Sequence, residues 1–230
     1  MWDSWTNEPV YRFFPQHEWA ENFCAGSIRV STLDACRKLE DKNRRDEKEG
    51  YLQYNSGDAF GNSGDPGLDL VVRRMDIVMV DCQNTTIRNS RNITLVPDAF
   101  VLCFSSHERP PPEAAFGAFG VRVNDPFALF CAITEQLALE QPGLRTSFGA
   151  VTYSDLEYTG LQSVPGIPGL LKRTPYSVES EVRMLWVPPR GHPPLTWRDV
   201  ECPTAMRHCE PLHPLDASKP YEAALGCRND

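Results

Sequence analysis

Two glutamates, Glu179 and Glu181, are the residues of this chain with the clearest capacity for chemistry. If residues 178–187 form a strand, both carboxylates lie on one face, about 6.6 Å apart along the chain. Like charges at that spacing repel each other, and burial would add a desolvation cost. We therefore predict a raised pKa for at least one carboxyl group, as in acid pairs that transfer protons.

The neighbouring residues indicate whether this acidic face is buried. Leu185 and Val187 continue the glutamate face, so its C-terminal half is predicted to be covered. Arg183, on the same face, can hold one carboxylate ionised. The alternative is an ordinary strand with a solvated polar face.

Two other polar sites lie at predicted strands far away in the sequence. Arg12 is embedded among aromatic residues in a short strand, residues 10–14, and Ser105 and Ser106 end a buried strand, residues 99–106. Each has a structural alternative: an arginine can serve an ion pair, and a serine at a strand end can satisfy a backbone group.

A third set contains possible metal ligands. Cys202, His208, Cys209 and His213 have zinc-binding side chains, but no Cys-x-x-Cys pair anchors them and prolines interrupt the segment. We predict no metal site, with these four residues as the open alternative.

The order Arg12, Ser105, Glu179-x-Glu181 resembles the ADP-ribosyltransferase fold, in its arginine–serine–glutamate branch. The chain also resembles a broad family of uncharacterised bacterial proteins over most of residues 10–187. That second resemblance rests on these segments: Tyr11-Arg12, residues 26–32, Cys103-Phe104-Ser105, Lys172, Tyr176 and Glu179 to Arg183. One departure is the segment Phe104-Ser105-Ser106, where the branch has Ser-x-Ser.

The resemblance implies NAD as the substrate and assigns roles to several residues. Glu181 would stabilise positive charge beside the nicotinamide ribose, and Glu179 would position or deprotonate the acceptor. Arg12 would pair with a cofactor phosphate, and Ser105 would bind the ribose or orient Glu181. The remaining cofactor contacts would come from Tyr11, Ser106 and an aromatic ring of Tyr51 or Tyr54 stacked on nicotinamide.

The function that follows is NAD-dependent ADP-ribosyl transfer to a protein or nucleic acid, as in bacterial toxins and phage-defence enzymes. A neutralising antitoxin would then be an expected partner. Two alternatives remain open: an NAD glycohydrolase with water as the acceptor, and a binding module of the same fold that has no catalytic activity.

Composition limits the partners and the location of the protein. The chain has 230 residues, 41% of them hydrophobic, and a net charge of -8, which disfavours a protein that wraps duplex nucleic acid. The N-terminal residues lack a signal-peptide pattern, and no apolar run is long enough to cross a membrane. We predict a cytoplasmic protein without a membrane partner.

The pattern of elements predicts one α+β domain, residues 1–230, with mixed or antiparallel split sheets and a few short helices. Residues 16–24 and 126–140 are predicted helices, and residues 68–72 and 76–81 are predicted strands. We expect residues 33–49 to form a short helix followed by a charged loop that is either exposed or ordered by a ligand, and residues 51–66 to form a mobile loop. The Pro-rich tail, residues 188–230, is expected to wrap the surface of the core.

Overall fold

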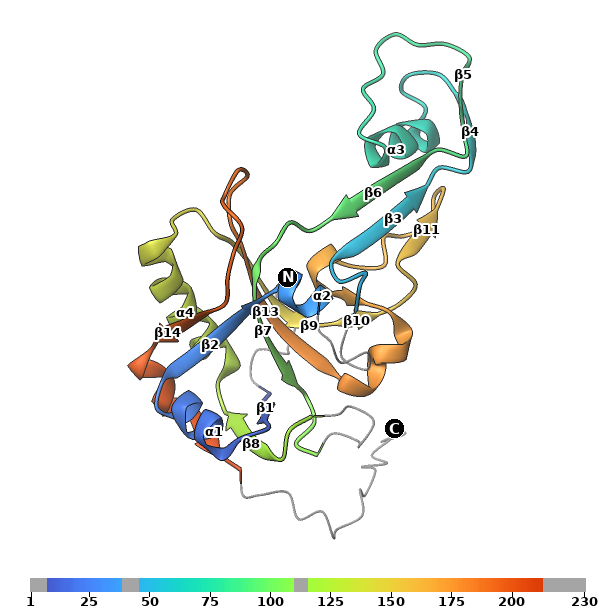
Figure 1. The fold of residues 1–230 in the computed structure, drawn as a ribbon. Coiled ribbons are helices and arrows are strands. Elements are labelled where there is room, and N and C mark those ends of the chain that lie inside the picture. The colour runs from blue at the N-terminus through green and yellow to red at the C-terminus, as the bar shows by residue number, and fades with distance from the viewer. Residues whose placement is uncertain (1–7, 39–45, 110–115, 213–230) are drawn as a thin grey trace.

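The computed structural model describes residues 8–38, 46–109 and 116–212, and two adjacent strands occupy its centre. These are β7 (Phe100–Ser105) and β13 (Glu181–Val187), which run antiparallel (Figure 1). Apolar and β-branched residues predominate in both, as expected for strands covered on two faces. The register pairs Glu181 with Ser105, so the ends of these distant segments lie side by side.

The two strands belong to an eight-stranded sheet in which every pairing is antiparallel. Its other strands are β1 (Val10–Phe14), β2 (Ser27–Thr32), β8 (Phe119–Val123), β9 (Arg145–Ala150), β14 (Arg198–Glu201) and β15 (Cys209–Pro211). One edge of β7 pairs with β13. The other edge pairs with β2 at Val101 and with β1 at Ser105, so a gap separates β1 and β2 beside the middle of β7.

One face of this sheet carries the main apolar core. It packs against α1 (His17–Cys24), α4 (Pro126–Glu140) and the short 3-10 helix η5 (Pro203–Arg207). Asp125 caps α4 by accepting from the backbone N–H of Ala128 at 2.8 Å, and Pro126 suits the first helical position. Trp186 on β13 is buried in this core and donates to Oγ1 of Thr134 at 2.7 Å.

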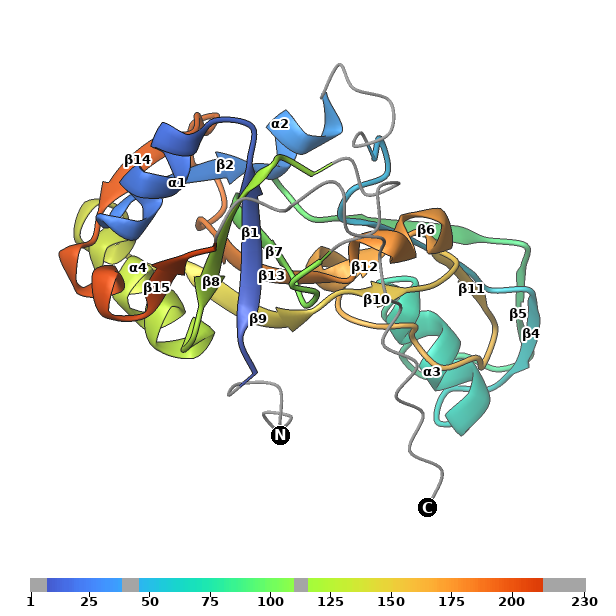
Figure 2. The same ribbon diagram turned by 90° about the horizontal axis from the view of Figure 1, so that it is seen from below.

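The opposite face of β13 is covered by shorter elements, which Figure 2 shows on the far side of the sheet from α1 and α4. They are α2 (Leu33–Arg37), β10 (Thr152–Tyr153), η3 (Pro168–Leu170), β12 (Leu171–Lys172) and η4 (Thr174–Glu179). Alternation along β13 therefore places Val182 and Met184 in the main core and Arg183 and Leu185 on this second face. The sequence predicted this division of residues 181–187, and it is confirmed.

A set of smaller elements projects away from the main sheet as an arm (Figure 1). Its members are β3 (Tyr51–Asn55), β4 (Asp58–Gly61), α3 (Pro66–Arg74), β5 (Thr85–Arg88), β6 (Arg91–Leu95) and β11 (Glu157–Thr159). β3 pairs with β6 and β11, and β4 pairs with β5.

The arm corrects three expectations. Residues 51–66 contain two strands where a loop was expected, and residues 68–72 belong to α3, because Leu68, Val71 and Val72 have the spacing that buries one helical face. Residues 76–81 form no strand; Asp76 and Asp81 adopt positive φ angles of 54° and 50°.

The C-terminal segment is better organised than a surface wrap. Within residues 188–212, β14 extends the main sheet beside β2, and β15 extends it beside β8. Residues 213–230 of the expected tail lie outside the described ranges. The protein has a mixed α+β fold with mostly antiparallel sheets, as predicted. None of the helices in the described ranges is both long and apolar enough to span a bilayer.

Candidate functional site

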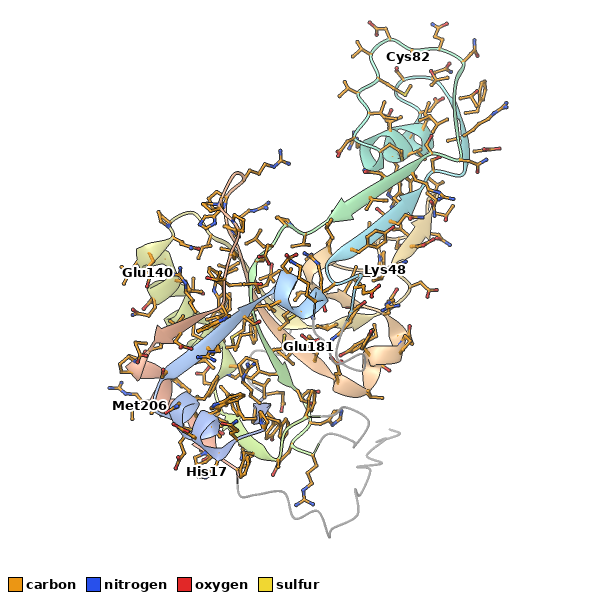
Figure 3. The ribbon with its side chains drawn as sticks, in the orientation of Figure 1. His17, Lys48, Cys82, Glu140, Glu181 and Met206 are labelled. Atoms are coloured by element: carbon orange, nitrogen blue, oxygen red, sulfur yellow. The ribbon has the colours of Figure 1, made fainter. Side chains whose placement is uncertain are left out.

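A cavity of about 320 Å³ opens on the second face of the main sheet. This volume lies at the lower end of the range for small-molecule pockets. Its walls include Arg12, Ser105, Glu179 and Glu181, which the sequence predicted would meet. Figure 3 places Glu181 in the middle of the molecule, far from Cys82 on the arm.

Glu181 begins β13 and is buried at 4% exposure. Its Oε1 accepts from Nε of Arg183 at 2.8 Å, and its Oε2 accepts from Nζ of Lys172 at 3.1 Å. Its backbone N–H donates to the hydroxyl of Tyr153 at 2.7 Å. Burial opposes ionisation, but the cations of Arg183 and Lys172 outweigh it and lower the pKa of Glu181 below its ordinary value. The side chain is therefore a fixed anion.

Glu179 is not on the strand, which corrects the prediction that both glutamates project from one strand. It ends η4, and Ser180 then adopts a left-handed conformation, with φ 44° and ψ 52°, before β13 begins. The two carboxylates converge instead on Lys172, whose Nζ donates to Oε2 of Glu179 at 2.6 Å. Burial raises the pKa of Glu179 to about 7; the charge of Lys172 offsets part of this shift, and the repulsion of Glu181 adds to it.

Lys172 is the cation that both carboxylates share, and the sequence did not assign it a role. Its side chain is 6% exposed, and its Nζ lies 5.0 Å from the ring centroid of Tyr176. Burial would lower the pKa of Lys172, but the charges of Glu181 and Glu179 raise it, so the amine stays protonated. Its position after a Gly- and Pro-rich loop predicted no partner. The contact between Lys172 and Glu179 forms only because η4 returns the chain to Lys172.

Arg183 continues the ionic network into the protein. Its Nη1 donates to Oε1 of Glu49 at 2.7 Å and to the backbone carbonyl of Gly169 at 2.9 Å. Glu49 and Asp46 were expected in an exposed charged loop, yet their exposures are only 3% and 1%. Buried charges need partners, and Asp46 has one in Arg173 at 2.8 Å. Their sequence context, a run of charges, gave no sign of this burial.

Ser105 and Tyr11 share the face of Glu181, because Ser105 is the cross-strand partner of both. Both line the cavity, whereas Ser106 does not. The Ser105 Oγ accepts from the backbone N–H of His107 at 3.1 Å, which leaves its own proton for another acceptor. Burial and the nearby Glu108 raise the pKa of Tyr11, so its hydroxyl is a donor.

Arg12 lines the cavity, but its side chain leaves β1 on the opposite face from Glu181. Its cross-strand neighbour is Val121 of the main core. The guanidinium turns into the gap between β1 and β2, where Nη1 donates to the carbonyl of Cys103 at 2.7 Å. Three aromatic ring centroids lie 5.4 to 6.0 Å from it: Phe14, Phe23 and Phe104. These contacts give Arg12 a structural role, which the sequence had left as an alternative.

We expect Arg12→Ala to lower the melting temperature more clearly than it weakens binding of NAD. The variant loses a hydrogen bond from a charged donor to a backbone carbonyl, worth about 1.5–3 kcal/mol. Thermal unfolding and NAD titration of Arg12→Ala and Arg12→Lys would check this. A large loss of NAD affinity without loss of stability would assign Arg12 to the cofactor instead.

Tyr51 and Tyr54 lie in the arm and not among the residues lining the cavity. Tyr51 donates from its hydroxyl to Gln53, and Tyr54 packs with Arg74 and Tyr158. The aromatic residues that line the cavity are instead Tyr11, Phe13, Phe104 and Phe116. The rings of Phe13 and Phe116 stack with centroids 5.6 Å apart.

The possible zinc ligands are only partly within the described ranges. His213 lies outside them, and burial raises the pKa of Cys209 to about 12, which keeps its thiol protonated at neutral pH. No group of three or more His, Cys, Asp or Glu residues in residues 8–38, 46–109 and 116–212 is placed to hold a metal ion.

The two carboxylates therefore share one cavity wall and one cation but differ in protonation. Glu181 remains anionic, while Glu179 gains or loses its proton near neutral pH. Paired carboxyl groups with pKa values pushed apart are suited to separate charge-stabilising and acid–base roles.

Comparison of the chain with protein-family models, with curated proteins and with solved structures gave no match.

Proposed function

We propose that this protein is an NAD-dependent ADP-ribosyltransferase with an ADP-ribosyltransferase-like fold, acting on a macromolecule in the cytoplasm as a toxin or defence enzyme. The observation that carries the proposal is the junction of Glu179, Glu181 and Ser105 at one cavity, in the order in which they resemble the arginine–serine–glutamate branch. The opposite pKa shifts of the two glutamates support the roles given to them.

The reaction exchanges one bond at the anomeric carbon of the nicotinamide ribose. The bond to nicotinamide breaks, and nicotinamide leaves with the bonding electron pair while positive charge develops on the ribose, as in glycoside cleavage. The fixed anion of Glu181 stabilises that charge. The acceptor atom bonds to the anomeric carbon, and its proton passes to Glu179.

Other cavity residues position the substrate in this proposal. The hydroxyl of Ser105 donates to a ribose oxygen, and Tyr11 provides a second hydroxyl on the same face. The stacked rings of Phe13 and Phe116 offer an apolar surface for nicotinamide, the contact that was expected from Tyr51 or Tyr54.

The rate should depend on the protonation of Glu179. We expect kcat/KM to rise with pH through about 7 and then to level off, because Glu179 accepts a proton only when ionised and its pKa is about 7. Measuring nicotinamide release from pH 5 to 9 checks this, with Glu179→Gln as the variant that should lose the rise. A flat profile for the wild-type protein would remove Glu179 as the base.

Hydrolysis of NAD is the second candidate, and the enclosure of Glu179 favours it. The Glu179 side chain is only 12% exposed and is held by Lys172, so water reaches it more easily than a large acceptor does. An enzyme of this kind would deplete NAD without modifying a target, and a neutralising antitoxin would protect the producing cell in either case.

Incubation with NAD labelled in the adenylate half distinguishes the two reactions. Label on protein or nucleic acid of a cell extract identifies a transferase, and free labelled ADP-ribose as the sole product identifies a hydrolase. Tight binding of NAD without either product would leave a binding module, and the enzyme proposal would fall.

A further inference from the structure

Arg29, to which the resemblance assigns no role, lies on the cavity face of the sheet. Along β2, Ile28 and Val30 enter the main core, so Arg29 and Ser31 point to the other side. Ser31 pairs with Val101, which lies on the same face as Ser105 and Glu181. Both Arg29 and Ser31 line the cavity.

Arg29 is oriented by two neighbours on β14 and just before it. Its Nε and Nη2 donate to Asp199 at 2.8 and 3.0 Å, and its guanidinium lies 4.1 Å from the ring centroid of Trp197. Within the described ranges, Nη1 has no hydrogen-bond partner, so two N–H donors are directed elsewhere. Trp197 is 56% exposed. The result is an exposed planar surface with fixed donors beside the cavity.

The charges of this surface select the type of ligand. Asp199 neutralises Arg29 and would repel a phosphate group, so the pair suits a neutral ring more than an anion. A purine fits, because its faces stack on indole and guanidinium planes and its ring nitrogens accept hydrogen bonds. Asp199 can accept from an amino group or a ribose hydroxyl.

The distance between Arg29 and Glu181 matches the length of a dinucleotide. The register of β2 places Arg29 level with Cys103, two residues along β7 from the Ser105–Glu181 pair and two strands from β13. Ordinary strand spacing and rise then separate the backbones of Arg29 and Glu181 by at least about 12 Å. In NAD the adenosine is the end farthest from the bond that breaks.

We infer that Arg29, which lines the cavity, and Trp197, which adjoins it through Arg29, form an adenosine subsite at the edge of this cavity: the purine stacks on their planar surface, and Nη1 of Arg29 donates to it. The inference rests on the proposed function for the identity of the ligand as NAD. The plain alternative is a surface cation–π contact that only stabilises the edge strand β14.

Trp197→Ala tests the inference through substrate truncation. We expect the KM for NAD to rise about tenfold, the effect of one lost aromatic–base stack, with kcat unchanged. The KM for nicotinamide mononucleotide, which lacks the adenylate half, should not change. Trp197→Phe should retain most of the affinity, and Trp19→Ala, which removes an exposed tryptophan on α1, should behave as wild type. An unchanged KM for NAD, or an equal rise for both substrates, overturns the subsite.

Binding of adenosine, measured by calorimetry, separates this inference from the enzyme proposal. Adenosine binding that Trp197→Ala and Arg29→Ala weaken, in a protein that does not cleave NAD, supports the subsite and refutes the proposed function. Cleavage of NAD with the same KM in wild type and Trp197→Ala supports the proposed function and refutes the subsite. Absence of adenosine binding at millimolar concentration also overturns the subsite.

Discussion

Glu181→Gln should lower the rate of NAD cleavage by about a hundredfold to a thousandfold. The substitution keeps the size of the side chain but removes the buried negative charge that, in the proposed reaction, faces the developing cation of the ribose. Loss of one preorganised electrostatic contact to a transition state typically has an effect of this size. Nicotinamide release under saturating NAD measures it.

A control is needed because Glu181 also holds Lys172 and Arg183, so its loss costs stability. Asp46→Asn is the matched variant. It neutralises another buried carboxylate, which pairs with Arg173 at 2.8 Å, and Asp46 does not line the cavity. Both variants should melt earlier than wild type, and only Glu181→Gln should lose activity. Equal activity losses in the two variants would make Glu181 a structural residue only.

Lys172→Met should have the largest effect on both stability and pH dependence. It removes the cation shared by Glu179 and Glu181, and breaking a buried ion pair costs about 3–5 kcal/mol. Lys172 lowers the pKa of Glu179, so its loss should raise that pKa above the present value of about 7. The rise of kcat/KM with pH should then move to higher pH, and activity at neutral pH should fall.

Denaturant unfolding and a pH–rate profile together check the Lys172 prediction. Lys38→Met is the comparison, because Lys38 pairs with Asp34 at 2.7 Å on the surface, where solvent screens such a pair and its loss should change stability little. Lys172→Arg, which retains the positive charge, should keep the wild-type pH profile better than methionine does. An unshifted profile in Lys172→Met would show that the lysine does not control Glu179.

The sequence was most informative where alternation is strict. The faces of β13, the burial of its C-terminal half and the ionisation of one glutamate by Arg183 follow from residue order and were predicted correctly. The helices at residues 16–24 and 126–140 were also recognised, because each has a Pro and an apolar face that mark it.

The remaining features depend on contacts that residue order does not encode. Ser180 adopts a left-handed conformation, which a serine in the sequence does not predict. This turn places Glu179 against Lys172 instead of on the strand. Glu49 can be buried because it pairs with Arg183, which lies 134 positions away in the sequence. In α3, a short run containing two valines favoured a strand, and packing against Ile87 decided for a helix.

The central claim is that this cavity cleaves the bond between nicotinamide and ribose, whichever acceptor follows. The most direct measurement is release of nicotinamide from NAD labelled in its nicotinamide ring, with the purified protein at pH 8 and Glu181→Gln alongside. Time-dependent release by the wild-type protein and about a hundredfold less by the variant is the predicted result. No release by a folded wild-type protein, or equal release by both, would contradict it.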